Sequence, residues 1–430
     1  MPDSPAAAQP AHRYALTFIF VTLLLDVVGF GIIIPVTPKL IQGLQGGTLA
    51  EAAQWGGYLG FSFAVLQFFT APVLGGLSDA YGRRPVLLFA LLGFGLDYVL
   101  QGFAPTLGWL FLGRCLAGIT GASFTVAAAY IADVSPPEKR AQNFGLIGAA
   151  FGLGFILGPV IGGLLGAKLG ARAPFFAAAI VALLNAGFGY FALPESLDAA
   201  HRRPFDWRRA NPIGSLRNLA RYPQITGLAG AMFLLYIAGH AAQSTWNYFT
   251  YERFRWDEAQ VGYSLAFVGL VAGVVQGGLT RVVIPRIGAR RAVLVGIAFY
   301  VVGLVCFAFA TEGWMMYAFM VPYGLGGLAG PATQALVSEA VSPSEQGELQ
   351  GALTSLISVS SIIGPLLMTG LFARFSHHTP GAVYFPGAPF LAGAALTVLA
   401  LGLVGVSFVR QRAARAARAD VARSTNPPAA

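Results

Sequence analysis

Three charged residues lie within segments that are otherwise apolar, namely Asp26, Asp97 and Arg114. A charged side chain at the centre of a membrane helix costs about 2.5–3.5 kcal/mol on insertion scales, so a charge found there usually has a function and a partner. A carboxylate can take up and release a proton, whereas an arginine stays protonated. We therefore expect Asp26 and Asp97 to exchange protons in a water-filled cavity, with Arg114 adjusting how readily each proton leaves. Isolated structural salt bridges are the alternative interpretation.

Polar residues also recur along one face of a later apolar segment. Tyr236, His240, Gln243 and Asn247 are spaced by four, three and four residues, which places them on one side of a helix. This face predicts the lining of a substrate cavity. His240 is also a proton-coupling candidate, and both a neutral hydrogen-bonded imidazole and a titrating one stay open. Other segments add single polar candidates, although an isolated amide often only links two helices: Gln67, Tyr98, Asn185, Gln276, Tyr323 and Gln334.

The elements that carry these residues are apolar runs of about 20 residues, the length that crosses a bilayer as a helix. Of the 430 residues, 56% are hydrophobic and only 10% are charged. A soluble domain carries about 25% charged residues, so the composition predicts a polytopic, all-α membrane protein. The twelve expected transmembrane helices are 14–34, 54–77, 85–103, 109–131, 143–166, 174–193, 223–250, 258–284, 290–310, 314–337, 349–372 and 389–409.

The basic residues predict the orientation of the chain. Most of the 27 Lys and Arg fall in the termini and in the even-numbered connections between spans, which favours a cytoplasmic position for both termini. Residues 1–10 carry no basic region, so a cleaved signal peptide is not expected. The net charge of +9 lies in loops and gives no indication of nucleic-acid binding. We expect a multi-pass protein of the cell (inner) membrane, in contact with the lipid bilayer.

The two halves of the chain repeat each other. Short matches recur in the same order at a nearly constant offset, which indicates a duplication. The expected fold is two pseudo-symmetric six-helix bundles, at 1–193 and 223–410, joined by a cytoplasmic linker at 194–222 and followed by a basic tail at 411–430. Parallel six-span repeats with a site near the midplane are typical of alternating-access transporters. The matches include Gly108-Trp109 with Gly313-Trp314, and Gly158-Pro159 with Gly364-Pro365.

A short charged loop at 75–88 separates the second and third spans. Within it, one acid, one turn glycine and two arginines follow closely: Asp79, Gly82, Arg83 and Arg84. Asp133, at the cytoplasmic end of span four, is expected near these arginines. We expect Asp79, Arg83 and Asp133 to form a cluster that is clamped shut in one state and open in the other. Gly82 and Arg84 are further members of this predicted cytoplasmic gate. A purely topological role for these charges is the alternative.

Span five has glycines at intervals of four residues, including Gly154, Gly158 and Gly162. Small residues at this spacing let a neighbouring helix backbone approach closely. Pro159 removes one helical hydrogen-bond donor and adds a bend. Close helix packing is therefore expected here whatever the function of the protein.

These motifs resemble those of the major facilitator superfamily. The loop at 75–88 matches the signature loop of that family, and span five is similar to the glycine-proline motif typical of its antiporters. LLLDVVGFGIIIPVTPKL at 23–40, LDY at 96–98 and GRCLAGITGA at 113–122 are most similar to the tetracycline/proton antiporters and related drug exporters. The resemblance implies the same fold and a role in drug export.

The resemblance also implies roles for single residues. Asp26 and Asp97 correspond to the membrane carboxylates linked to drug and proton movement, and Arg114 to the motif arginine of span four. The second half departs from the pattern. Ala272 and Tyr300 stand where the well-studied tetracycline pumps carry a histidine and an aspartate, so the resemblance does not specify tetracycline as the substrate.

The first functional hypothesis is a proton-coupled antiporter that exports amphipathic small molecules by alternating access. It needs no cofactor beyond the proton gradient and is expected to work as a monomer. The alternatives are a facilitator of a sugar or other polar metabolite, and a membrane receptor without transport. The sequence contains no phosphate-binding glycine loop, no metal-spaced His/Cys cluster and no nucleophile motif, so no enzyme activity and no metal site are expected.

Overall fold

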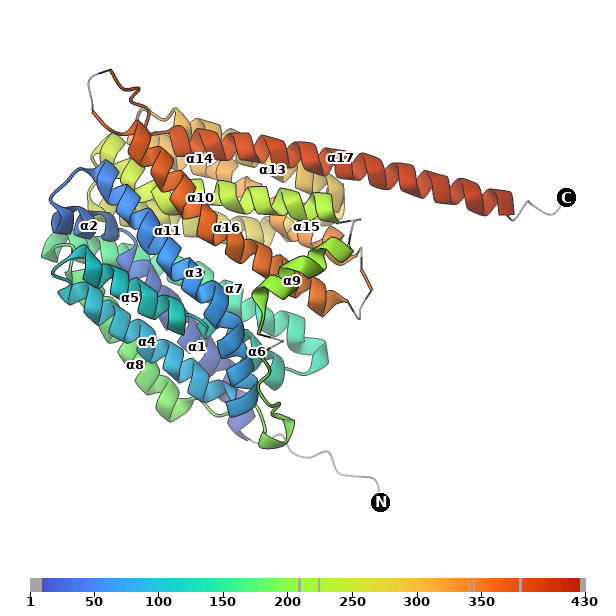
Figure 1. Cartoon of the computed structure of the whole chain (residues 1–430), viewed down its shortest axis with the longest axis horizontal. Coiled ribbons are helices and arrows are strands. Elements are labelled where there is room, and N and C mark those ends of the chain that lie inside the picture. Colours follow the sequence, from blue (N-terminus) through green and yellow to red (C-terminus); the bar gives the residue numbers. More distant parts are fainter. Residues whose placement is uncertain are drawn as a thin grey trace. The chain divides into compact units, whose positions relative to one another are not determined.

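The computed structural model describes residues 10–425, apart from 208–209, 223–224, 340, 343–344 and 379–380 (Figure 1). Every regular element among the described residues is a helix. The chain divides into two compact units. Unit 1 contains Met1–Pro212, Ser244–Gly273 and Pro365–Pro386, and unit 2 contains Ile213–Gln243, Val274–Gly364 and Gly387–Ala430. The division into bundles at 1–193 and 223–410 stays a prediction.

The helices of unit 1 come mostly from the first half of the chain. They are α1 (Pro10–Ile33), α2 (Thr37–Gln45), α3 (Leu49–Tyr81), α4 (Arg83–Phe103), α5 (Leu107–Thr120), α6 (Ser123–Val134), α7 (Pro137–Leu169), α8 (Ala173–Ala192), the short η1 (Ala199–His201) and nearly all of α11 (Glu258–Val274). Two long helices, α10 (Thr226–Phe254) and α16 (Gln346–Phe375), contribute residues to both units.

The remaining helices belong to unit 2. They are α9 (Pro212–Asn218), which begins one residue before the unit, η2 (Leu219–Arg221), the π-helical turn η3 (Val275–Leu279), α12 (Thr280–Ile287), α13 (Ala289–Ala308), α14 (Gly313–Leu325), η4 (Gly326–Leu328), α15 (Ala329–Ser338) and α17 (Ala388–Thr425).

Each of the twelve predicted spans lies mostly in helix, and residues 223–224 of the seventh lie outside the described residues. Among the described residues, ten helices are long and apolar enough to cross a membrane. The two predicted spans outside this set have physical reasons to fall short. The polar residues His240 and Gln243 lower the hydropathy of α10, and glycines, prolines and tyrosines lower that of the span at 314–337, which the turn η4 divides into α14 and α15.

Local sequence signals explain several helix ends. The helix α3 begins with a capping box, in which Thr48 accepts a hydrogen bond from the Glu51 backbone and Glu51 accepts one from the Thr48 backbone. Gly82 separates α3 from α4 with a φ of 107°, a conformation that glycine adopts without steric cost. The short helix α2 was not predicted, because nine residues between two spans give too weak a periodic signal.

Each unit has its own apolar core. In unit 1, Ile19 and Leu23 of α1 are buried with Val126 and Tyr130 of α6. In unit 2, buried aliphatic side chains of α10, α13 and α17 meet, including Leu228, Ile297 and Val404. The membrane-facing sides of these helices carry many exposed apolar side chains, as expected where lipid replaces water.

Candidate functional site

The Asp97 carboxylate is completely buried between α4 and α5, with 0% of its surface exposed. It forms an ion pair with Arg114 and accepts a hydrogen bond of 2.6 Å from Gln101 Nε2. Gly113 provides the space, because a Cβ at this position would lie 2.6 Å from Asp97 Oδ1. Arg114 Nε is buried without a hydrogen-bond partner among the described residues. The structure therefore brings together two of the three predicted intramembrane charges.

Asp26 lies on α1 in the same unit and is 7% exposed. Its Oδ2 accepts a hydrogen bond of 2.6 Å from Ser123 Oγ, at the start of α6. Tyr98 follows Asp97 on α4 and its ring faces α1, because a Cβ at Gly29 would lie 3.6 Å from Tyr98 Cε2. Sequence reasoning missed Ser123. Its hydroxyl faces α1 because the helix is broken at Gly121–Ala122, and the sequence did not predict this break.

The charged residues of the 75–88 loop form a cluster with Asp133. Arg83 pairs with Asp79, and its Nε donates to Asp133 Oδ2 at 3.0 Å. Its Nη1 also donates to Ser78 Oγ at 2.8 Å. Arg84 points elsewhere and donates to the carbonyl of Tyr190 on α8. The expected neighbours Asp79, Arg83 and Asp133 are thus in contact, while Arg84 ties α4 to α8.

Glu195 completes this cluster and was missed by the sequence analysis. Its carboxylate accepts hydrogen bonds from the backbone N–H groups of Arg83 at 2.8 Å and Arg84 at 3.2 Å. These are the first N–H groups of α4, where an anion satisfies otherwise unpaired donors and interacts favourably with the helix dipole. The next residue, Ser196, donates to Asp133 Oδ2 at 3.1 Å. A carboxylate two residues beyond the end of span six was the available signal.

The predicted cavity residues of unit 1 hold helices together. Gln67 Nε2 donates to the carbonyl of Gly121 at 2.8 Å, and Asn247 Nδ2 donates to the carbonyl of Ile34 at 2.5 Å. Asn185 Nδ2 similarly donates to the carbonyl of Thr22 at 2.8 Å. Their backbone acceptors agree with the linking role that single amides often have.

The candidates of unit 2 are polar and aromatic residues, and none of them is a carboxylate, a lysine or an arginine. On α10, Tyr236 is 40% exposed, Gln243 is exposed, and His240 packs against Gly364 of α16. Tyr300 donates to the Tyr323 hydroxyl at 3.4 Å, with the two ring centroids 4.9 Å apart. The other two candidates lie on η3 and α15: Gln276 is exposed, and Gln334 donates to Gln350 at 2.8 Å.

The glycine face of span five packs closely against α1. A Cβ at Gly158 would lie 2.7 Å from Gly31 Cα, and one at Gly154 would lie 2.6 Å from Val27 Cβ. Gly162 faces the Ile32 backbone even more closely. The carbonyl of Pro159 faces Gly262 of α11, so the same stretch contacts two helices.

A second set of contacts lies beyond the C-terminal end of α1. It joins α2 and the turn before it to α10 and α11. Lys39 Nζ on α2 pairs with Glu258 Oε1 at the start of α11, at 3.0 Å. Tyr251 of α10 donates to the carbonyl of Pro35 at 2.5 Å, and Lys39 lies over its ring. Sequence reasoning did not single out these residues, because a lysine and a glutamate far apart in the sequence carry no local sign of their pairing. Among the described residues, no group of three or more His, Cys, Asp or Glu side chains could hold a metal ion.

Comparisons with known proteins identify the family of this chain. The sequence profile of the Major Facilitator Superfamily matches residues 19–310 and 254–429. The class C tetracycline resistance protein of Escherichia coli is 41% identical over 387 residues, which cover 90% of this chain and 95% of that protein. The class G tetracycline resistance protein of Vibrio anguillarum is 40% identical, over 85% of this chain and 92% of that protein.

Solved structures have the same fold. The human organic anion transporter MFSD10 (TETRAN) superposes with a TM-score of 0.67 at 26% identity, over 92% of this chain and all of that one. The nucleoside transporter NupG gives 0.72 at 12% identity, over 92% and 99% of the two chains, a likeness of fold alone. The chain therefore belongs to the Major Facilitator Superfamily of membrane transporters, together with the tetracycline resistance proteins.

Proposed function

We propose that this protein is a proton-coupled antiporter that exports amphipathic small molecules, including drugs, by alternating access. The observation that carries the proposal is the completely buried Asp97 carboxylate, which is paired with Arg114 on the neighbouring helix α5. Buried ionisable residues in membrane helices are typical of proton and substrate pathways. The tetracycline resistance proteins, similar to this chain over most of its length, support export of drugs.

Protonation of Asp97 would remove the negative charge that faces Arg114. Arg114 cannot lose its own proton, so the ion pair exists only while Asp97 is ionised. Asp26 is the second carrier, because Ser123 stabilises its charged form by donating a hydrogen bond. Loss or gain of these interactions would favour one conformational state over the other, which is how a bound proton biases an equilibrium between two states.

The proton gradient can supply the energy without a cofactor. A proton that enters the cell gains about 2.3 kcal/mol per 100 mV of membrane potential. A difference of one pH unit adds about 1.4 kcal/mol. A tenfold gradient of an uncharged substrate costs about 1.4 kcal/mol, so one proton could sustain a gradient of several hundred-fold.

The neutral polar residues of unit 2 fit the recognition of the exported molecule. Tyr236, Tyr300 and Tyr323 offer aromatic faces and hydroxyl groups, which suit planar molecules with apolar and polar parts. The protein would act as a monomer in the cell (inner) membrane with both termini in the cytoplasm. In this orientation the cluster of Asp79, Arg83, Asp133 and Glu195 forms the cytoplasmic gate.

Release of protons from purified protein on addition of a drug tests the coupling. Tetracycline and a panel of amphipathic drugs would be added in weakly buffered detergent solution, with a pH dye as the readout. We expect Asp97→Asn or Asp26→Asn to abolish uphill export by proteoliposomes while drug binding stays measurable. Glu312→Gln is the matched control, because Glu312 is an exposed acid outside the spans. Full proton release from the Asp26→Asn/Asp97→Asn double variant would exclude these two carriers.

A further inference from the structure

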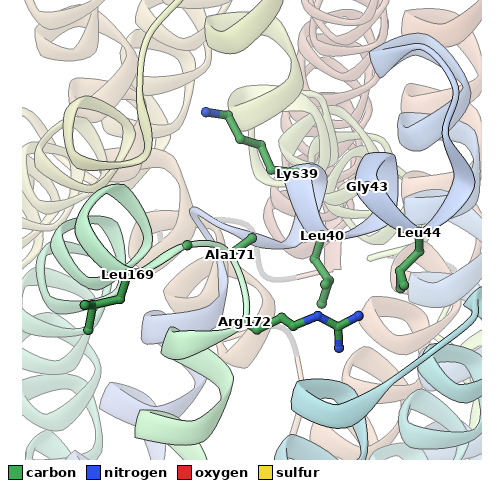
Figure 2. A pocket seen from close by; sticks show the side chains of 8 residues that line it. Lys39, Leu40, Gly43, Leu44, Leu169, Ala171 and Arg172 are labelled. Carbon is green, nitrogen blue, oxygen red and sulfur yellow. The ribbon is translucent and has the colours of Figure 1, made fainter.

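A pocket of about 360 Å³ lies in unit 1, at the end of the helices opposite to the 75–88 loop. It is bordered by α2, which supplies Leu40, Gly43 and Leu44, and by the turn that links α7 to α8, which includes Leu169 and Arg172. Figure 2 shows Arg172 extending beneath Leu40 toward Leu44, with Leu169 on the other side. Nothing in the proposed export mechanism uses this pocket.

The positive charge of Arg172 is not neutralised. Its Nη1 and Nη2 donate to the carbonyls of Gly102 and Ala104, both at 2.8 Å, which fixes the guanidinium in place. Within the described part of the chain, no carboxylate lies within 4.0 Å of it. Lys39 also borders the pocket but turns away from Arg172, toward Glu258, with which it is paired (Figure 2). The Arg172 guanidinium is thus positioned by two backbone carbonyls and has N–H donors that these two hydrogen bonds do not use.

The pocket lies at the level where membrane spans end. The candidate span of α7 ends at Leu169 and that of α8 begins at Ala173, so Arg172 lies between them at the bilayer surface. Leu169 is 69% exposed and Phe103, next to the carbonyls that hold Arg172, is 70% exposed. Trp109 is exposed at the start of α5, as is typical of aromatic residues at a membrane interface. Leu40, Leu44 and Leu169 therefore border the pocket together with a cation at headgroup depth, and further exposed aromatic residues lie at the same end of the helices.

We propose that this pocket binds the headgroup phosphate of an anionic phospholipid, with Arg172 as the phosphate ligand. A phosphate would take the free N–H donors of the guanidinium, whose planar arrangement matches its oxygens. The acyl chains would continue along exposed Leu169 into the bilayer. A soluble organic phosphate offers the same oxygens but no chains, so the apolar surroundings favour the lipid.

Native mass spectrometry of the full-length protein in detergent tests this site. The protein is titrated separately with dioleoylphosphatidylglycerol, with dioleoylphosphatidylcholine and with glycerol 3-phosphate. We expect one phosphatidylglycerol molecule to be retained with at least about tenfold higher affinity than either of the other two, a difference of about 1.4 kcal/mol. Arg172→Gln should remove this preference.

A second variant leaves the carbonyl contacts of Arg172 intact. Gly43 borders the pocket, and a Cβ there meets no atom within 4 Å, so Gly43→Leu would fill the space without a clash. It should also remove the preference for phosphatidylglycerol. Lys168→Gln is the matched control, because Lys168 is exposed in the last turn of α7 but does not border the pocket. It should keep the preference.

Three results would overturn the proposal. One is equal affinity of the wild type for phosphatidylglycerol and phosphatidylcholine. Another is a preference that a general surface charge explains. In that case the preference would survive both Arg172→Gln and Gly43→Leu, or Lys168→Gln would lower it as strongly as these two variants do. The third is binding of glycerol 3-phosphate as tight as that of the lipid, which would assign the pocket to a soluble anion.

Discussion

Glycines of α7 that have the same spacing in sequence differ in what surrounds them, and this difference predicts opposite effects of one substitution. A Cβ at Gly158 would lie 2.7 Å from Gly31 Cα and 2.8 Å from the carbonyl oxygen of Val28. Ordinary carbon contacts lie at about 3.5–4.0 Å. A Cβ at Gly148 would meet no atom within 4 Å. Gly158→Ala therefore forces α1 and α7 apart, whereas Gly148→Ala touches nothing.

The expected magnitudes follow from two opposing effects. Alanine is a better helix former than glycine by about 1 kcal/mol, a gain that both variants share. Overpacking at Gly158 costs about 1–3 kcal/mol, because the obstructing atoms belong to the backbone and cannot rotate away. Gly158→Ala should thus be less stable than Gly148→Ala by about 1–3 kcal/mol. Gly158→Leu should misfold or remain in one conformation.

Unfolding of the purified variants by a denaturing detergent, followed by circular dichroism, measures this difference. Transport in proteoliposomes at equal protein content reports the functional effect, and we expect Gly148→Ala to transport as the wild type does. Equal stability of the two alanine variants would refute the close contact between α1 and α7. Normal transport by Gly158→Leu would show that this glycine is not needed for close packing.

Other predictions concern the two ends of the helices. Glu195→Ala should lower the free energy of unfolding by about 0.5–2 kcal/mol, the usual value of a helix N-cap, because the first N–H groups of α4 lose their acceptor. A thermal shift in detergent measures this effect. An unchanged melting temperature would contradict the capping role of Glu195. Asp79→Asn should fold normally, because surface ion pairs contribute only about 0–1 kcal/mol, but slow turnover by weakening the hold on Arg83. Comparable transport rates at equal expression would refute that role. Tyr251→Phe should lower stability by about 0.5–1.5 kcal/mol through loss of the hydrogen bond to Pro35, and an identical unfolding curve would exclude it.

Hydropathy predicted the spans because a bilayer requires long apolar helices, and each predicted span is mostly helical among the described residues. Hydropathy could not predict where those helices break. The break at Gly121–Ala122 and the turn η4 depend on the packing of neighbouring helices, as the contact of Gly326 with the ring of Tyr300 illustrates. Glycine is common in membrane helices, so its presence does not distinguish a break from a packing site.

The charges of the candidate site were easier to predict than the amides. Asp97 and Arg114 are costly in a membrane, which made a partner for each a physical requirement. An amide such as Asn247 satisfies its hydrogen bonds with any nearby carbonyl, so its spacing along α10 did not predict the acceptor, Ile34. Glu195 lies outside the spans, where a carboxylate is ordinary. Its contact with the start of α4 becomes visible only in three dimensions.

The intramembrane charges and the polar residues of unit 2 lie in different units, which bears on how a transporter of this kind changes its substrate. Asp26, Asp97 and Arg114 all belong to unit 1, whereas the cavity candidates of unit 2 are neutral. A neutral polar residue can be replaced by another of similar size at small electrostatic cost. Replacement of one member of the Asp97–Arg114 pair removes the ion pair on which the proposed proton coupling depends. Under the proposed function, substrate recognition through unit 2 can therefore vary, at Tyr300 for example, while the charged residues of unit 1 are retained.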